Sequence, residues 1–211
     1  MEAVRVCWHY NKKKTKVAKE ADPEERAQFQ NQQNKLPVER LVFIDEFGIH
    51  LAMTRNCARA PMGQRAFVAE PFVTGINISV VGALTIEGIS APMTLEGAMD
   101  GACFDCYVEK FLVRELLPGD IVILDNVKFH YSQHAINIIE SAKASVLYLP
   151  AYSPDLNPIE ECISKIKTIL RKIKARTKRK LMSALTWAID QITSSDIIGW
   201  FIHAGYTCSS K

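Results

Sequence analysis

The stretch IVILDNVKFHYSQHAINIIESAKASVLYL, residues 121–149, decides the fold class of this chain. It opens with the apolar run 121–124, continues with Ala135, Ile138 and Ile139 at helical spacing, and ends with a second apolar run at 146–149. Short apolar runs that alternate with a helix are typical of buried parallel strands. The sequence therefore predicts a strand–helix–strand unit with its helix over about 131–142.

The residues before this unit predict further strands and one helix. Apolar and alternating segments bounded by Pro, Gly and polar residues predict strands at 41–44, 65–69, 76–86 and 89–95. Helical spacing then runs from Gly101 to Leu116, and Pro118 and Gly119 follow it. We expect an α/β fold with a mixed sheet, in which an antiparallel meander precedes parallel strands and helices flank both.

The two ends of the chain are helical in pattern. Asp22 and Pro23 suit the cap and first position of a short helix that runs to about Lys35. Asn157 and Pro158 suit the start of a longer helix, and further helices are predicted at about 177–193 and 195–204. The buried stripe of the longer helix is expected to contain Ile159, Ile163, Ile166, Ile169 or Leu170, and Ile173.

Charge is distributed unevenly although the net charge is only +3. One basic run spans 12–19 and a second spans 165–180, and neither contains an acid. Apart from these 14 cations, 12 Lys and Arg face 23 Asp and Glu. Such a chain combines an acidic body that suits cations with basic surfaces that suit a polyanion, although a charge run is also compatible with a solvated helix face.

Composition excludes several classes of protein. Hydrophobic residues make up 48% and charged residues 23%, which is ordinary for a globular chain and unlike a fibre or a disordered tail. No apolar run approaches the length of about 18 residues that spans a bilayer. The sequence also lacks a Gly-rich phosphate loop and a Gly-x-Ser-x-Gly elbow.

Three acids stand where ligands bind in α/β proteins. Asp45 and Asp125 each follow an apolar strand, and Glu160 lies in the first turn of the helix after the last strand. Converging carboxylates form sites for Mg²⁺, and two such ions support phosphodiester chemistry. Each acid also has a simpler interpretation, because Asp45 can begin a turn, Asp125 an Asx-turn, and Glu160 can serve a capping box.

Three segments resemble the catalytic segments of DDE transposases of the mariner/Tc superfamily, in its bacterial insertion-sequence branch. They are FIDE at 43–46, ILDN at 123–126 followed by His130, and LPAYSPDLNPIE at 149–160. Between Asp125 and Glu160 lie 34 residues, the spacing typical of that family. The segment 55–65 and the sequence FIHAGY at 201–206 are similar to further family segments.

The resemblance implies an RNase H-like catalytic domain over 39–206, preceded by a polar and basic lead-in at 1–38 and followed by a tail at 207–211. It implies that Asp45, Asp125 and Glu160 bind two Mg²⁺ or Mn²⁺ ions. Asn126, His130 and Asn157 are expected beside the metal site or in contact with DNA. The expected DNA-binding residues are Arg55, Arg59, Arg65, Lys165, Lys167, Arg171, Lys172, Lys174 and Arg176.

The expected function is metal-dependent DNA cleavage and strand transfer in cut-and-paste transposition. The expected partners are double-stranded DNA, namely transposon ends and target, and a second copy of the chain. Only 44 residues precede Asp45, so we expect no helix-turn-helix pair in this chain. We expect a separate product to supply that pair. The expected location is the prokaryotic cytoplasm, at the nucleoid. A DNA-binding remnant without activity and a metal-dependent phosphohydrolase for small esters remain alternatives.

Overall fold

A computed structural model of the chain describes residues 19–55, 60–67, 69–70 and 75–207. Its centre is a five-stranded sheet in the order β3-β2-β1-β4-β5. The strands are β1 (Leu41–His50), β2 (Asn77–Leu84), β3 (Ile89–Glu96), β4 (Ile121–Leu124) and β5 (Ser145–Tyr148). β1 pairs antiparallel with β2, and β2 pairs antiparallel with β3, whereas β4 runs parallel to β1 and β5 runs parallel to β4. The predicted mixed sheet, a meander followed by parallel strands, is therefore confirmed.

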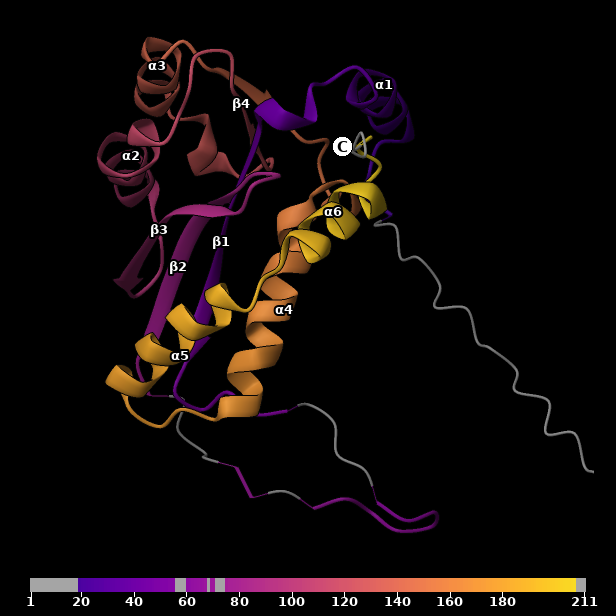
Figure 1. Ribbon diagram of the computed structural model, residues 1–211, viewed down its shortest axis with the longest axis vertical. Coiled ribbons are helices and arrows are strands. Elements are labelled where there is room, and N and C mark those ends of the chain that lie inside the picture. Colours follow the sequence, from indigo (N-terminus) through magenta and orange to yellow (C-terminus); the bar gives the residue numbers. More distant parts are fainter. Residues whose placement is uncertain (1–18, 56–59, 68, 71–74, 208–211) are drawn as a thin grey trace, which may run out of the picture.

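Helices cover both faces of the sheet (Figure 1). On one face lie α2 (Gly101–Lys110) and α3 (Gln133–Ser141), and on the other lie α4 (Pro158–Ile173), α5 (Lys178–Asp190) and α6 (Ser194–His203). α1 (Pro23–Gln33) packs at one end, and short 3-10 turns occupy Val38–Arg40, Leu112–Arg114, Lys128–Tyr131 and Pro154–Leu156. Among the described residues, no helix is long and apolar enough to cross a membrane.

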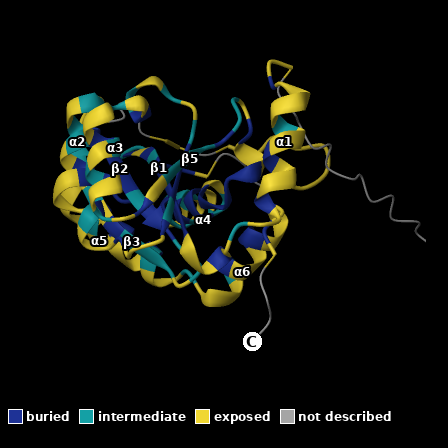
Figure 2. Ribbon diagram, turned by 90° about the horizontal axis from the view of Figure 1, so that it is seen from above, coloured by how far each residue is buried: buried dark blue, intermediate teal, exposed yellow. Residues whose placement is uncertain are grey.

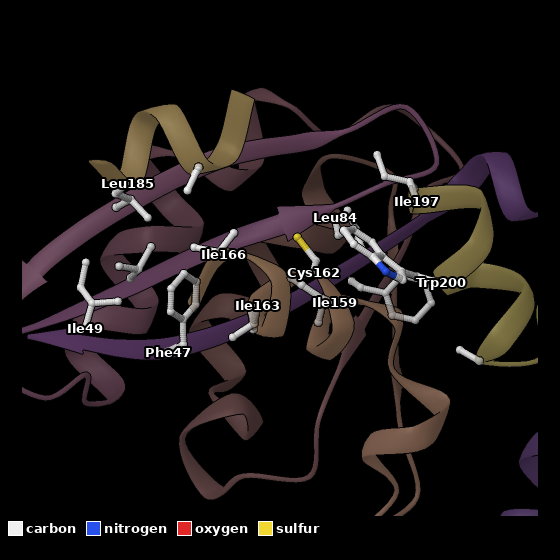
Figure 3. Packing of buried hydrophobic residues seen from close by; sticks show 14 of the residues in the cluster. Phe47, Ile49, Leu84, Ile159, Cys162, Ile163, Ile166, Leu185, Ile197 and Trp200 are labelled. Atoms are coloured by element: carbon white, nitrogen blue, oxygen red, sulfur yellow. The ribbon is translucent and has the colours of Figure 1, made fainter. Parts of the chain in front are cut away.

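The core has two parts because side chains alternate across the strands. Phe43, Phe47 and Ile49 of β1 face α4, α5 and α6, whereas Val42 and Ile44 face α2 and α3. Figure 3 shows the first part, where Phe47 lies near Ile163 and Ile166 of α4. Seen from above in Figure 2, the buried residues lie along the sheet and the inner helix faces.

α4 begins as predicted, with Asn157 at the N-cap and Pro158 at the first position, and Ile159, Ile163, Ile166 and Leu170 are buried. One expectation for it is wrong. Ile173 is 41% exposed, because it lies in the last turn beyond the sheet-facing stripe. The basic run 165–180 covers the end of α4 and the start of α5, because Lys174 is left-handed (φ 53°) and ends α4 before α5 begins.

Three other boundaries differ from the sequence prediction. The described residues within 65–69 belong to no strand, and residue 68 lies outside the described part. α2 ends at Lys110 rather than near Leu116, because the chain tightens into a 3-10 turn at 112–114 while Leu112 and Leu116 stay buried. β1 continues six residues beyond Ile44, because residues 43–50 pair with β2.

The ends of the described chain meet beside the 150–158 loop. Phe29 of α1 joins the core, and Arg26 makes two hydrogen bonds of 3.0 and 2.7 Å to Asp155 in that loop. At the other terminus, the Tyr206 hydroxyl donates to the Leu156 carbonyl at 3.1 Å, and the Tyr206 ring packs edge-on against Phe43. The loop before α4 is therefore held from both ends of the chain.

Candidate active site

Strand register places the first two acids side by side. Phe43 of β1 pairs with Ile123 of β4, so the residues two positions further along, Asp45 and Asp125, leave the parallel ladder at the same level. Asp45 therefore lies inside β1 rather than at the end of a strand, with Gly82 of β2 as its antiparallel partner. The strands that end at this level are β4, at Leu124, and β5, at its partner Tyr148, so the predicted sheet edge is formed by β4 and β5 rather than by β1.

The side-chain environment of Asp45 is buried and negatively charged. Asp45 is 8% exposed and lies with Phe47, Ile159 and Cys162 around a small apolar cavity under α4. Burial, followed by the charges of Glu160, Glu46 and Asp125, raises its pKa to about 8, although the Glu46 N–H donates to Asp45 Oδ1 at 2.8 Å and opposes the shift. Burial and the three neighbouring acids therefore outweigh the hydrogen bond that Asp45 accepts.

Glu160 comes to the same site from the first turn of α4. Burial raises the pKa of Glu160, Lys167 two turns further along α4 opposes that effect, and Asp125 and Glu46 add to it. Asp45 and Glu160 thus each respond to Asp125 and to Glu46. The three predicted acids are brought together, and Glu46 is a fourth acid that the sequence analysis did not select.

His130 is the positive counterpart of these acids. It is 0% exposed, its Nδ1 lies 2.6 Å from Asp125 Oδ1, and its Nε2 lies 3.6 Å from Glu46 Oε2. Burial opposes the charged imidazolium, but contacts with Asp125 and Glu46 outweigh burial and raise the pKa of His130 to about 9. These are ion pairs rather than aligned hydrogen bonds, because Asp125 Oδ1, Glu46 Oε2 and His130 Nε2 all lack a hydrogen-bond partner among the described residues.

A cleft of about 450 Å³ opens beside the acids. Its wall contains Asp125, Asn126, Asn157 and Glu160 together with the loop 149–154. Asn157 is 5% exposed, but its side chain does not cap α4, and its Oδ1 lacks a hydrogen-bond partner within the described chain. Asn126 accepts a 2.5 Å hydrogen bond from the Tyr131 hydroxyl. The site is therefore open to a ligand on this side.

The donor atoms suit a hard divalent cation. Carboxylate oxygens are the ligands that Mg²⁺ and Mn²⁺ prefer, and a bound cation would offset the burial and the neighbouring acids that raise the pKa values of Asp45 and Glu160. In the described part of the chain, no three His, Cys, Asp or Glu side chains are close enough to hold one ion as they stand. The residues fit the ions by chemistry and by charge.

The structure also locates the residues predicted to bind DNA. Lys167 lies over the Phe47 ring, and Lys167 and Arg171 line a hollow with His50 and Thr54. Lys165 pairs with Asp196 at 2.5 Å, and Arg176 donates to the Leu51 carbonyl at 2.7 Å. Arg55, Arg65, Lys172 and Lys174 are exposed, and Arg59 lies outside the described residues.

A comparison with protein families identifies the family of this chain. The family model described as DDE superfamily endonuclease matches residues 40–182, a span that contains Asp45, Asp125 and Glu160. The chain therefore belongs to the DDE superfamily endonucleases. A comparison with curated proteins finds no match.

Solved structures of the Mos1 transposase share the fold. A Mos1 paired-end complex with the left transposon end is 17% identical with a TM-score of 0.75, over 93% of this chain and 64% of that chain. A Mos1 mariner paired-end complex with Mn is 17% identical with a TM-score of 0.71, over 92% and 63%. The catalytic domain of Mos1 mariner transposase is 14% identical with a TM-score of 0.63, over 86% and 85%. The chain thus spans somewhat less than two thirds of the longer Mos1 chains, and its RNase H-like fold is confirmed.

Proposed function

We propose that this chain is the catalytic domain of a bacterial insertion-sequence transposase of the mariner/Tc type, which cleaves DNA and transfers the cut strand. The observation that carries the proposal is the convergence of Asp45, Asp125 and Glu160 on one site, where Asp45 and Glu160 have raised pKa values. The Mos1 neighbours, which include complexes with transposon ends and with Mn or Mg, support the same function.

Asp45, Asp125 and Glu160 would hold two Mg²⁺ or Mn²⁺ ions. When bound, such ions activate an attacking hydroxyl and stabilise the leaving oxygen of a phosphodiester. His130 pairs with the Asp125 carboxylate, holds it in place and partly neutralises it. The cleft beside Asn157 and Asn126 admits the nucleic-acid strand that carries the scissile phosphate.

The proposal extends to the partners of the chain. DNA is the substrate, a homodimer holds two ends, and a separate helix-turn-helix product supplies sequence recognition. The proposed location is the prokaryotic cytoplasm, on nucleoid DNA. The basic residues Lys167 and Arg171, two and three turns along α4 from Glu160, favour DNA over a small phosphate ester as substrate, since they extend the site along a polyanion.

The test is a plasmid-nicking assay in Mn²⁺, in Mg²⁺ and in EDTA with Glu160→Gln and Glu161→Gln compared directly. Glu161 is the matched control, because it is the next residue of α4 and pairs with His203 instead of facing Asp45. We expect metal-dependent nicking that Glu160→Gln abolishes and Glu161→Gln retains. Turnover of small phosphate esters without nicking, or DNA binding without nicking, would replace the proposal with one of the two alternatives.

A further inference from the structure

A basic groove lies between the end of α4 and the first turns of α5, away from the carboxylate site. It has a volume of about 780 Å³ and no acidic residue in its lining. Its lining includes the apolar side chains Ile173 and Ala184 and the cations Lys174, Arg176, Arg179 and Lys180. The groove thus combines apolar surface with positive charge.

Three of these cations are available to a ligand. Lys174, Arg179 and Lys180 are exposed and form no ion pair within the described residues. Arg176 is engaged by the Leu51 carbonyl, and the neighbouring Lys178 points elsewhere, to Glu96 of β3. The first turn of α5 adds the positive end of a helix dipole, because the Thr177 cap accepts only from the Lys180 N–H.

The groove continues a basic stripe that starts at the carboxylate site. Glu160, Lys167 and Arg171 are spaced by seven and four residues, which puts them on one face of α4, and Lys174 follows at the C-cap of that helix. At 1.5 Å per residue, Lys174 lies about 20 Å along the axis from Glu160. Duplex DNA covers that distance in about six base pairs, since its phosphates repeat every 3.4 Å along each strand.

We propose that this groove, through Arg179 and Lys180 with Lys174, binds the phosphate backbone of the DNA duplex about six base pairs from the scissile phosphate. The inference rests on the proposed function and adds a contact surface on α5 that does not touch the reacting atoms. An acidic protein would complement the charge of the groove alone. A DNA backbone would also complement the charge of the basic stripe that leads from the carboxylate site to the groove. The contact is with phosphates and therefore independent of base sequence.

The test measures the affinity for a labelled 30-base-pair duplex by anisotropy in EDTA across a salt series. Arg179→Gln/Lys180→Gln is compared with Lys143→Gln/Lys178→Gln, which removes the same charge outside the groove. Losing two phosphate contacts should reduce the slope of log affinity against log salt by about two. The ratio of wild-type to groove-variant affinity should then shrink about tenfold between 50 and 200 mM salt, and the control should keep the wild-type slope.

A second readout separates this inference from the proposed function. In Mn²⁺, the groove variant should raise the KM for plasmid nicking and leave kcat unchanged, because the groove is remote from Asp45 and Glu160. Equal slopes for the groove variant and wild type, or a slope loss shared by the control, would overturn the groove proposal while nicking by wild type still stands. Absence of both nicking and DNA binding in the wild type would instead overturn the proposed function.

Discussion

At the scale of single residues, His130 is the buried group that pairs with two acids of the site. Its ring is buried against Phe104 and Phe129, and it faces both Asp125 and Glu46. A buried cation between two carboxylates holds together groups that would otherwise repel each other. The acids of this site therefore depend on a residue that takes no part in the carboxylate triad.

We expect His130→Ala to lower the free energy of unfolding by about 2–4 kcal/mol, because it leaves a cavity beside two phenylalanines and removes the partner of two acids. His134→Ala is the control, since His134 is exposed on α3. Urea unfolding followed by circular dichroism measures both variants. Equal, small losses in the two would show that the ion pairs with Asp125 and Glu46 contribute nothing to stability.

The contacts of His130 are the part of the site that could not be predicted from the sequence. Asp45 and Asp125 were predictable because each follows an apolar run, and Glu160 because it lies in the first turn of the helix after the last strand. Glu46 was not predicted, and the alternation of side chains puts it on the face of β1 opposite to Asp45. Only the position of His130 between the two faces, which depends on the 3-10 turn at Lys128–Tyr131, connects Glu46 with Asp125.

At the scale of elements, α6 is fixed to α4 by a polar cap. Thr193 and Asp196 form a capping box at the start of α6, and Asp196 also accepts from Lys165 of α4 at 2.5 Å. The Lys165 and Thr193 hydrogen bonds lower the pKa of Asp196 to about 2. Since α6 carries Phe201, which packs against Phe43 of β1, this cap supports the strand that bears Asp45.

We expect Asp196→Asn to reduce thermal stability at neutral pH and to lose that effect in acid. A carboxyl whose folded pKa lies below its unfolded value stabilises the fold above about pH 4, and the contribution is lost as the pH falls toward 2. Melting of wild type and variant at pH 7, 4 and 2.5 measures the difference. A difference in melting temperature that stays constant over this range would contradict a role for the Asp196 charge.

Element boundaries were predictable where a local pattern of residues sets them. They were not predictable where pairing with another strand or the backbone conformation of a single residue sets them. The start of α4 at Asn157-Pro158 is local, and the prediction held. The far end of β1 depends on pairing with β2, and the break at Lys174 depends on a left-handed residue that its sequence does not demand. The basic run therefore spans the end of α4, the groove and the start of α5.

At the scale of the whole molecule, one sheet divides two hydrophobic clusters, and β1 and β4 contribute side chains to both. Ile123 and Leu124 are neighbours in β4, but Ile123 belongs to the cluster under α4 and Leu124 to the cluster under α2 and α3. A strand that loses packing on one face cannot keep its position for the other. The two faces should therefore unfold together.

We expect Leu124→Ala to destabilise the whole molecule by about 3–5 kcal/mol and to do so in one transition, although it removes packing only from the side of α2 and α3. The reporters are Trp187 of α5 and Trp200 of α6, on the opposite side, in a Trp8→Phe background. Their fluorescence and far-ultraviolet circular dichroism should shift to lower urea by the same amount. Ile166→Ala, from the other cluster, should produce the same coincidence. If tryptophan fluorescence kept its wild-type midpoint in Leu124→Ala while circular dichroism shifted, the helical layer that carries Glu160 and the basic groove would be a separate folding unit.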